Sequence, residues 1–123
     1  MIMITALIQP SRLNHVRREL LSADLAGLTV SDCFGYGRQP RFVPSPHGGT
    51  DIPDILPNMK IEIAVPSDRR DEAIDAIMRG ARLGTIDDGK IFVSQLEKVV
   101  SVRTGLENEV TLQSSNWPAE AAE

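Results

Sequence analysis

The sequence predicts an α+β fold in which one antiparallel sheet is covered on one face by two helices. Two observations lead to this class: four short apolar or alternating segments alternate with two amphipathic ones, and a long proline-rich connection divides the chain near its middle. With 123 residues, of which 41% are hydrophobic and 24% charged, the chain has the size and composition of one globular domain. The expected order is strand, helix, strand, long loop, strand, helix, strand.

Five segments have the patterns of strands. Ile2–Ile8 is an apolar run without charge, which is typical of a strand buried on both faces. Leu28–Phe34 and Lys60–Val65 alternate between polar and apolar residues, as strands with one exposed face do. Lys90–Gln95 is the fourth strand, and Val99–Arg103 predicts a short fifth.

Two segments have helical spacing of apolar residues. The first runs from about Arg12 to Ala23, and Ser11 is its expected N-cap. The second runs from about Asp68 to Leu83, with acidic residues early and arginines late, as the helix dipole favours. Together with the strands, this order indicates a ferredoxin-like βαββαβ sandwich with a long loop between strands 2 and 3.

Two helices can cover only one face of a four-stranded sheet. We expect apolar residues on the other face as well, which predicts assembly of several copies through that face. The residues expected there are Thr5, Leu7, Ile61 or Ile63, and Val93.

The connection Arg38–Asn58 contains five prolines and a Gly-Gly pair, a composition that excludes a continuous helix and any central strand. Connections of this length are usually functional or disordered. Gly35 and Gly37 flank its start, where the backbone could approach a ligand closely. The simpler alternative is a flexible hairpin insertion without a ligand.

The distribution of charged residues along the chain limits the kinds of partner that it can bind. Residues 1–105 hold all 13 basic residues and 13 of the 17 acidic ones, whereas 106–123 hold four acidic residues and no basic one. A domain without net charge, followed by an acidic tail, lacks the basic surface that binds nucleic acid. The single cysteine, Cys33, is favoured as a buried structural thiol, and no segment has the length of a membrane span or the pattern of a signal peptide, so we expect a cytoplasmic protein.

One short motif has the chemistry of a phosphate site. In Asp87–Lys90 a glycine turn with exposed N–H groups is followed by a lysine, which could hold a phosphate, although an ordinary turn with a solvated lysine has the same sequence. His15 and His47 have no second ligand at metal-binding spacing, so no metal site is expected, apart from a nucleotide-bound Mg²⁺. No catalytic motif is present, and we expect no enzyme.

Four segments together resemble one protein family, and they stand in its register from Met1 to about Gly105. They are Phe34–Gln39, Leu56–Pro66, Asp88–Val93 and Arg103–Gly105. The chain resembles the nitrogen-regulatory PII signal-transduction family. This resemblance implies a homotrimer whose sheets face a threefold axis, three clefts between subunits that bind adenine nucleotides, and a loop, about 36–58, that reports the nucleotide state to a regulated protein such as a transporter or an enzyme. It also sets the expected boundary between the domain, 1–105, and the acidic tail, 106–123.

The resemblance also implies the binding residues. Thr29 would bond the adenine, with Gly27 and Ala64 lining that pocket. The phosphates would be met from the loop base and from the opposite side by Gly35, Gly37, Arg38, Gln39, Asp88, Gly89, Lys90 and Arg103. Cations and N–H groups of this kind can neutralise a diphosphate.

The chain departs from the family pattern at several of these positions. A lysine that grips 2-oxoglutarate in the family is here Asn58, and a phosphate-binding arginine is Ser101. Asp51 stands where the modifiable tyrosine would be, which excludes uridylylation there, and Asp87 replaces a glycine beside the phosphates. Because one charge 4 Å away is worth about 4 kcal/mol at an effective dielectric near 20, these changes favour ADP or AMP over ATP.

These departures are similar to those of divergent PII-like proteins tied to carbon uptake, including carboxysome-associated ones. In that reading bicarbonate is a second ligand, with Arg41 and Lys60 as possible anion-binding residues. The alternative is a conventional ATP- and 2-oxoglutarate-binding nitrogen regulator. Two further hypotheses are a weak nucleotide hydrolase using Gln39 and Lys90 around Mg²⁺, and a structural trimer whose cleft binds nothing.

Overall fold

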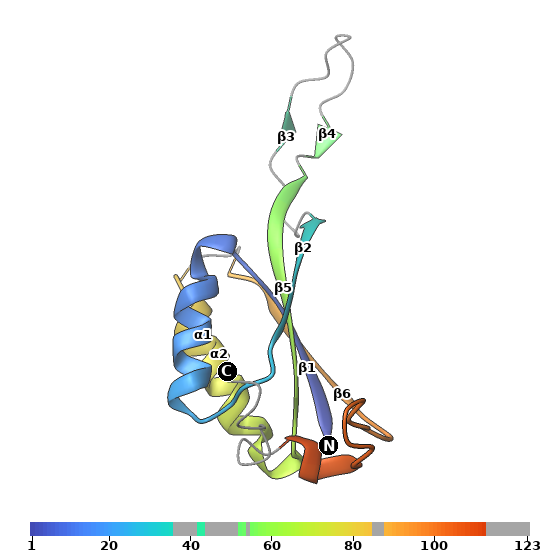
Figure 1. Cartoon of the computed structure of the whole chain (residues 1–123). Helices are drawn as coiled ribbons and strands as arrows, with labels where there is room; N and C mark the ends of the chain where they lie inside the picture. The colour runs from blue at the N-terminus through green and yellow to red at the C-terminus, as the bar shows by residue number, and fades with distance from the viewer. Residues whose placement is uncertain (36–41, 44–51, 54, 85–87, 113–123) are drawn as a thin grey trace.

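The computed structural model describes residues 1–35, 42–43, 52–53, 55–84 and 88–112, and the fold below concerns these residues (Figure 1). The strands are β1 Ile2–Ile8, β2 Thr29–Gly35, β3 Phe42–Val43, β4 Ile52–Pro53, β5 Leu56–Val65 and β6 Lys90–Gln95. The α-helices are α1 Leu13–Ser22 and α2 Arg70–Ala81, and the 3₁₀ turns are η1 Pro10–Arg12, η2 Ser67–Arg69 and η3 Asn108–Leu112. No described helix is long and apolar enough to cross a membrane.

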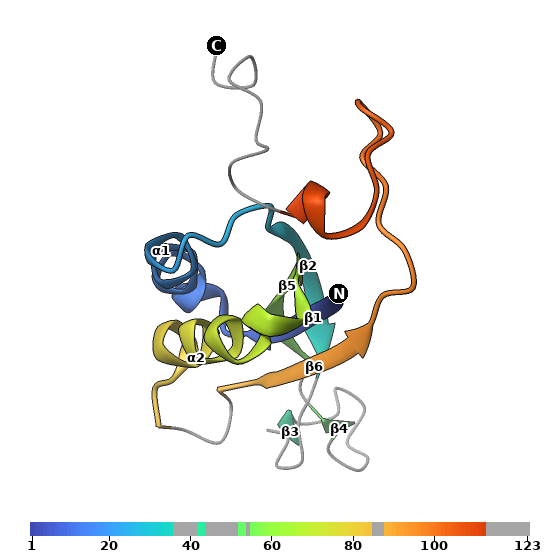
Figure 2. The ribbon, with the colours of Figure 1, turned by 90° about the horizontal axis from the view of Figure 1, so that it is seen from below.

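The main sheet has the strand order β2-β5-β1-β6 and is antiparallel throughout. Both helices lie on the same side of it (Figure 2). This is the predicted ferredoxin-like arrangement. The apolar run of β1 takes a central place between β5 and β6, as its lack of charge predicts.

The core lies between the helices and one face of the sheet. Alternate residues of β1 and β5 point into it, and Ile4, Ile61 and Ile63 are at most 1% exposed. The prediction that Ile61 or Ile63 lies on the uncovered face was therefore wrong. Val93 is also on the helix side, because it pairs with Ile4.

The uncovered face carries the residues that alternate, along each strand, with those that face the helices. They are Met3, Thr5 and Leu7 of β1, Lys60, Glu62 and Ala64 of β5, Phe92 and Ser94 of β6, and Thr29 and Ser31 of β2. Thr5 and Leu7 thus lie where they were expected. Phe92 leaves 51% of its surface exposed there. This face is mixed, with an apolar centre and a Lys60–Glu62 ion pair at 3.8 Å.

The long loop is shorter than the sequence suggests, because β5 begins at Leu56. Pro57 therefore lies in a central strand, which the prediction excluded. The exclusion fails because of where Pro57 lies in β5. The pairing of β5 with β1 ends at Met59, so the residues of β5 before Met59 pair only with β2. A proline is tolerated at such an edge. Within the loop, β3 pairs with β4 as a small antiparallel ribbon (Figure 1).

The helix boundaries agree with the sequence within two residues, but the start of α1 differs. Ser11 lies inside η1 and the N-cap is Arg12, with no side-chain capping bond. The expected Ser11 cap was thus wrong, because Pro10 starts a 3₁₀ turn one residue earlier. The Nε of Arg12 instead donates to the carbonyl of Gly80 at 2.9 Å, which ties the start of α1 to α2.

The segment after β6 also differs from the prediction. Val99–Arg103 is not a fifth strand: residues 99–107 form an arm closed by a single bridge between Val100 and Glu107, and by the ion pair Lys98–Glu107 at 3.0 Å. Its turn is held by the N–H of Gly105, which donates to the carbonyl of Ser101 at 2.8 Å. Beyond it, residues 108–112 form η3, inside the expected tail of residues 106–123.

Arg69 connects the start of α2 to the end of α1, and its ion pair with Glu72 makes stability depend on pH. Arg69 donates to Glu72 at 3.0 Å and also to the carbonyls of Ala23 and Asp24, at the end of α1. The hydrogen bond from Arg69 lowers the pKa of Glu72 below its ordinary value. A carboxylate whose pKa is lower in the folded state stabilises above its unfolded pKa, and this contribution is lost as the pH falls through the folded value.

We therefore expect Glu72→Gln to reduce stability slightly at neutral pH and to have no effect once the pH lies below the folded pKa of Glu72. Denaturant unfolding of both proteins across the acid range measures this. A destabilisation that is the same at every pH would show that the charge of Glu72 is not its cause.

Candidate functional site

The described candidate residues fall into two groups at opposite ends of the sheet. The first group is at the loop end, where a row of paired residues crosses the uncovered face: Lys90, Leu7, Lys60 and Ser31, on β6, β1, β5 and β2. Lys90 is exposed at one edge of this row. Gly35 ends β2 beyond the row, next to the side chain of Asn58 on β5.

Gly89 and Asp88 hold the turn that places Lys90 in this group. The Oδ2 of Asp88 accepts hydrogen bonds from the N–H groups of Leu83, at 3.0 Å, and Gly84, at 2.8 Å. Gly89 has a φ of +110°, and its α-carbon lies so close to β1 that an added Cβ would be 1.7 Å from the carbonyl oxygen of Leu7. Both residues therefore have a structural role, and their contact with a nucleotide stays a prediction.

The second group lies toward the other end of the sheet. Thr29 pairs with Glu62, Ala64 pairs with Met3, and Gly27 lies in the connection just before β2. Lys90 instead pairs with Leu7. Because Leu7 and Met3 are four residues apart on β1, Ala64 lies roughly 13 Å farther along the strands than Lys90. Thr29 is in register with Thr5, only two residues from Leu7, but it lies on β2, at the opposite edge of the sheet from Lys90 on β6.

Arg103 also belongs to this second end. It lies on the arm of residues 99–107, which follows β6 at the end of the sheet where Gln95 pairs with Ile2, and Figure 2 shows this arm extending away from the sheet and helices. Arg103 is exposed on it, and its neighbour Val102 is completely exposed. An apolar side chain held out on a hydrogen-bonded arm is a surface that a second molecule would cover.

The sequence did not single out Val102, because Val99–Arg103 was interpreted as a strand. The alternation of Val100 and Val102 was the available signal, and it fits an arm as well as a strand. The remaining candidates, Gly37, Arg38, Gln39 and Arg41, lie outside the described residues, as do Asp51 and Asp87. The described residues contain no cluster of three or more side chains of His, Cys, Asp or Glu that could hold a metal ion.

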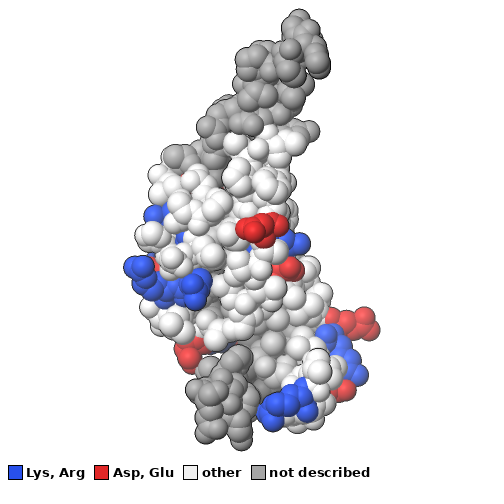
Figure 3. All heavy atoms as spheres, turned by 45° about the horizontal axis from the view of Figure 1, so that its top comes forward, with Lys and Arg blue, Asp and Glu red and all other residues white. Residues whose placement is uncertain are grey.

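Figure 3 shows side chains of both signs scattered over one face of the protein, with large uncharged areas between them and no continuous basic field. Cys33 is free and only half-buried at the loop end of β2, so the expectation of a buried thiol was wrong. It lies on the uncovered face because it pairs with Asn58.

The fold defines a class of small α+β protein with a four-stranded antiparallel sheet, two helices on one face of it and the other face uncovered. Comparison with known proteins gives the family. The family model described as "Nitrogen regulatory protein P-II" matches residues 1–106. The chain therefore belongs to the nitrogen regulatory P-II family, whose members are regulatory proteins.

Several relatives are similar over most of their length. The nitrogen regulatory protein P-II of Pasteurella multocida is 42% identical over 106 residues, which cover 86% of this chain and 95% of that protein. The nitrogen regulatory protein GlnK of Escherichia coli K12 is 39% identical over 110 residues, covering 89% and 98%. The solved structure of Arabidopsis thaliana PII bound to citrate has a TM-score of 0.75 at 32% identity, and covers 91% of this chain and 89% of that one.

Proposed function

We propose that this P-II protein is a non-catalytic, homotrimeric sensor that binds adenine nucleotides in clefts between subunits and regulates a partner protein through its long loop. The observation that carries this proposal is the separation of the two groups of candidate residues. Lys90 and Gly35 lie toward the loop end of the sheet and Ala64 and Arg103 toward the other end, and Thr29 lies on the opposite edge strand from Lys90, so one protomer alone does not assemble the predicted site. A cleft between two protomers would join the loop end of one to the arm of the next.

The uncovered face supports this assembly. Its centre is apolar at Met3, Leu7 and Phe92, and Phe92 is half exposed although it lies in the sheet of a folded domain. Burial of apolar surface contributes roughly 25 cal/mol per Å². Packing this face against other copies would bury it and would bring the arm of residues 99–107, with Val102, against a neighbour.

The charges favour ADP or AMP over ATP within this proposal. Among the described candidate residues, Lys90 and Arg103 are the cations without a carboxylate partner, whereas Lys60 is paired with Glu62 at 3.8 Å. Ser101 supplies no charge where the family pattern has an arginine. Two cations and several N–H groups suit a short phosphate chain better than a long one.

Two candidates remain for a second effector. Asn58 lies beside Gly35 at the loop base, and its neutral amide does not supply the positive charge that 2-oxoglutarate would need. The neutral side chain favours a small anion such as bicarbonate as the second effector, with Lys60 and Arg41 as its contacts. The names of the relatives, all nitrogen regulatory proteins, favour the conventional sensor of ATP and 2-oxoglutarate instead. Mg²⁺ would accompany the nucleotide chiefly if the protein is this conventional sensor of ATP and 2-oxoglutarate.

Calorimetric titration of the protein with AMP, ADP and ATP, each with and without 2-oxoglutarate and bicarbonate, tests these proposals. Tighter binding of ADP or AMP with no effect of 2-oxoglutarate would support the adenylate sensor, and coupling to bicarbonate would support a role in inorganic carbon metabolism. ATP binding that is strengthened by Mg²⁺ and 2-oxoglutarate would show a conventional nitrogen regulator. Because a ligand at 100 times its dissociation constant stabilises by about 2.7 kcal/mol, unchanged thermal stability with all three nucleotides would favour a cleft that binds nothing.

Replacement of Arg103 by alanine is expected to weaken ADP binding by about 10- to 150-fold, because a charge-assisted hydrogen bond to phosphate contributes roughly 1.5–3 kcal/mol. The fold and the oligomeric state should not change, since the side chain is exposed on the arm. Arg70→Ala is the matched control, because Arg70 is equally exposed on α2 and pairs only with Asp71 among the described residues. If both variants bind ADP as the unaltered protein does, Arg103 is not part of the site.

A further inference from the structure

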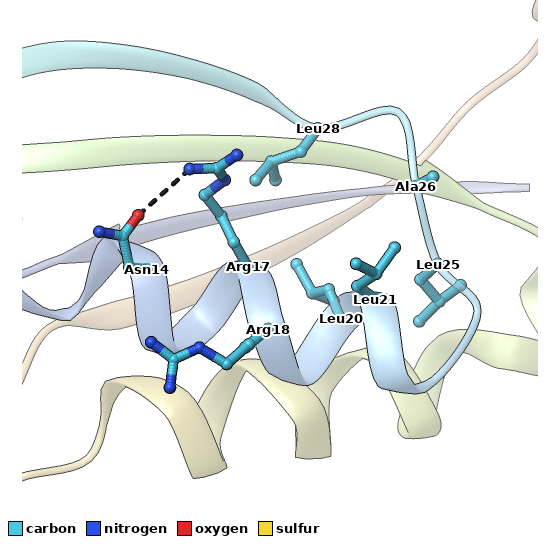
Figure 4. A pocket seen from close by; sticks show the side chains of 8 residues that line it. All are labelled: Asn14, Arg17, Arg18, Leu20, Leu21, Leu25, Ala26 and Leu28. Carbon is cyan, nitrogen blue, oxygen red and sulfur yellow. Dashed lines mark hydrogen bonds between the residues drawn. The ribbon is translucent and has the colours of Figure 1, made fainter. Parts of the chain in front are cut away.

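A groove separate from the candidate nucleotide site lies between α1 and the connection to β2 (Figure 4). Its volume is about 380 Å³. Its floor and walls are mainly apolar and its rim is polar: the lining residues are Leu20, Leu21, Leu25, Ala26 and Leu28, with Asn14, Arg17 and Arg18. Leu21, on α1, is 69% exposed and adds to the apolar surface of the groove.

The wall of this groove is fixed by the way α1 ends. The N–H of Leu25 donates to the carbonyl of Leu20 at 2.9 Å, and the N–H of Asp24 donates to that of Leu21 at 3.0 Å. With Asp24 at a φ of 57°, this is a Schellman ending, which buries Leu25 against the helix. Arg69 holds the same turn from α2 through its bonds to the carbonyls of Ala23 and Asp24. The groove is therefore preformed.

The rim of the groove is positive. Arg17 extends from α1 toward Leu28 and donates to the Oδ1 of Asn14 at 3.1 Å (Figure 4). Within the described part of the chain, neither Arg17 nor Arg18 forms a salt bridge. The groove thus combines exposed apolar surface with two cations that have no carboxylate partner, which suits a segment carrying an apolar anchor and negative charge.

We propose that the groove is the docking site of this chain's own residues 113–123, with Trp117 between the leucines and Glu120 and Glu123 near Arg17 and Arg18. The tail has the complementary chemistry: after Leu112 it contains the only tryptophan of the chain and two glutamates, and no basic residue. A tryptophan has a large apolar body and a polar N–H, which suits an open groove at the surface.

The tail begins at the end of the sheet where the groove lies. η3 ends at Leu112 and contacts β5, at the same end of the sheet as the connection from α1 to β2 (Figure 1). Trp117 follows five residues later, so it can lie up to roughly 17 Å from Leu112, and Glu123 up to roughly 38 Å. The groove residues Ala26 and Leu28 flank Gly27 of the candidate nucleotide site, but none of the lining residues is itself a candidate for binding the nucleotide.

The fluorescence of Trp117 tests the proposal directly, since no other tryptophan contributes. In the full-length protein we expect emission at a shorter wavelength than in the same protein unfolded in urea, and weaker quenching by acrylamide. Leu21→Asp places a carboxylate in the groove at an exposed position, and Arg17→Glu/Arg18→Glu reverses the charge of the rim. Each should move the emission and the quenching to the values of the unfolded chain without changing the far-ultraviolet circular dichroism. Arg70→Glu, an equally exposed charge reversal on α2, is the control that should leave both unchanged.

Three results would overturn the proposal. The first is emission of the unaltered protein that already equals that of the unfolded chain. The second is shielded emission that none of the groove variants alters, because Trp117 would then pack elsewhere. The third concerns which copy is bound: if mixing Leu21→Asp with Trp117→Phe protein restores the shielded emission, the tail docks on a neighbouring protomer and not on its own.

Discussion

Replacement of Gly80 by alanine is expected to destabilise the protein, although the same change in most helices stabilises. Gly80 lies in α2 where it crosses α1, and a Cβ there would be 2.5 Å from the α-carbon of Val16 and 2.7 Å from its nitrogen. Both are backbone atoms of a residue that is completely buried, so the helices must move apart. Alanine gains roughly 1 kcal/mol in helix propensity over glycine, whereas overpacking of a core costs about 1–3 kcal/mol.

We expect the clash to exceed this gain, with a net loss of up to about 2 kcal/mol for Gly80→Ala and unfolding for the larger Gly80→Leu. Separation of the helices would also lengthen the bond from Arg12 to the carbonyl of Gly80. Urea unfolding at one fixed protomer concentration measures the loss, because the stability of an oligomer depends on concentration. Asp75→Ala, an exposed change on the same helix, is the control that should alter stability by less than about 0.5 kcal/mol. A more stable Gly80→Ala protein would show that α1 can move away without cost.

Periodicity predicted the elements of this fold well, but it could not predict how closely they approach. The alternation in 60–65 correctly placed Lys60 and Glu62 on one face of β5 and Ile61 on the other. Nothing in the sequence pattern distinguishes Gly80, inside a helix, from a glycine of no consequence. Its role depends on the crossing of two helices, α1 and α2, that are separated by the whole of β2, the long loop and β5.

The errors have a common cause, which is that local composition does not reveal which neighbours a segment has. Pro57 was taken to exclude a central strand, yet it lies where β5 has lost its pairing with β1. Val99–Arg103 alternates as a strand does, but β6 is followed by an arm with no strand to pair with. For the candidate site, residue types identified Lys90 and Arg103 as cations. Only the sheet register shows that they lie at opposite ends of the protomer, which residue types alone could not reveal.

Replacement of Gly89 by alanine is expected to have the largest effect of any single methyl group added at a described glycine. The added Cβ would lie 1.7 Å from the carbonyl oxygen of Leu7 and 2.9 Å from its carbon, so β6 and β1 could not remain paired at Leu7 and Lys90. The φ of +110° adds strain, which for a residue other than glycine costs of order 1–3 kcal/mol. We expect a total loss of at least 3 kcal/mol, or failure to fold. Gly84→Ala is the matched control, since Gly84 also has a positive φ, of +79°, but no atom within 4 Å of the added Cβ.

The comparison of these two variants separates a structural role of Gly89 from a role in binding. If the glycine is required by the approach of β1, Gly89→Ala must lose far more stability than Gly84→Ala in the complete absence of nucleotide. If instead it is required by a phosphate group, the two variants will have similar stability without ligand, and Gly89→Ala alone will lose ADP binding. The position of the Leu7 carbonyl leads us to expect the first result. In that case Gly89 contributes to the candidate site indirectly. It lets the turn lie close to β1, so that Lys90 can begin β6 at the edge of the uncovered face.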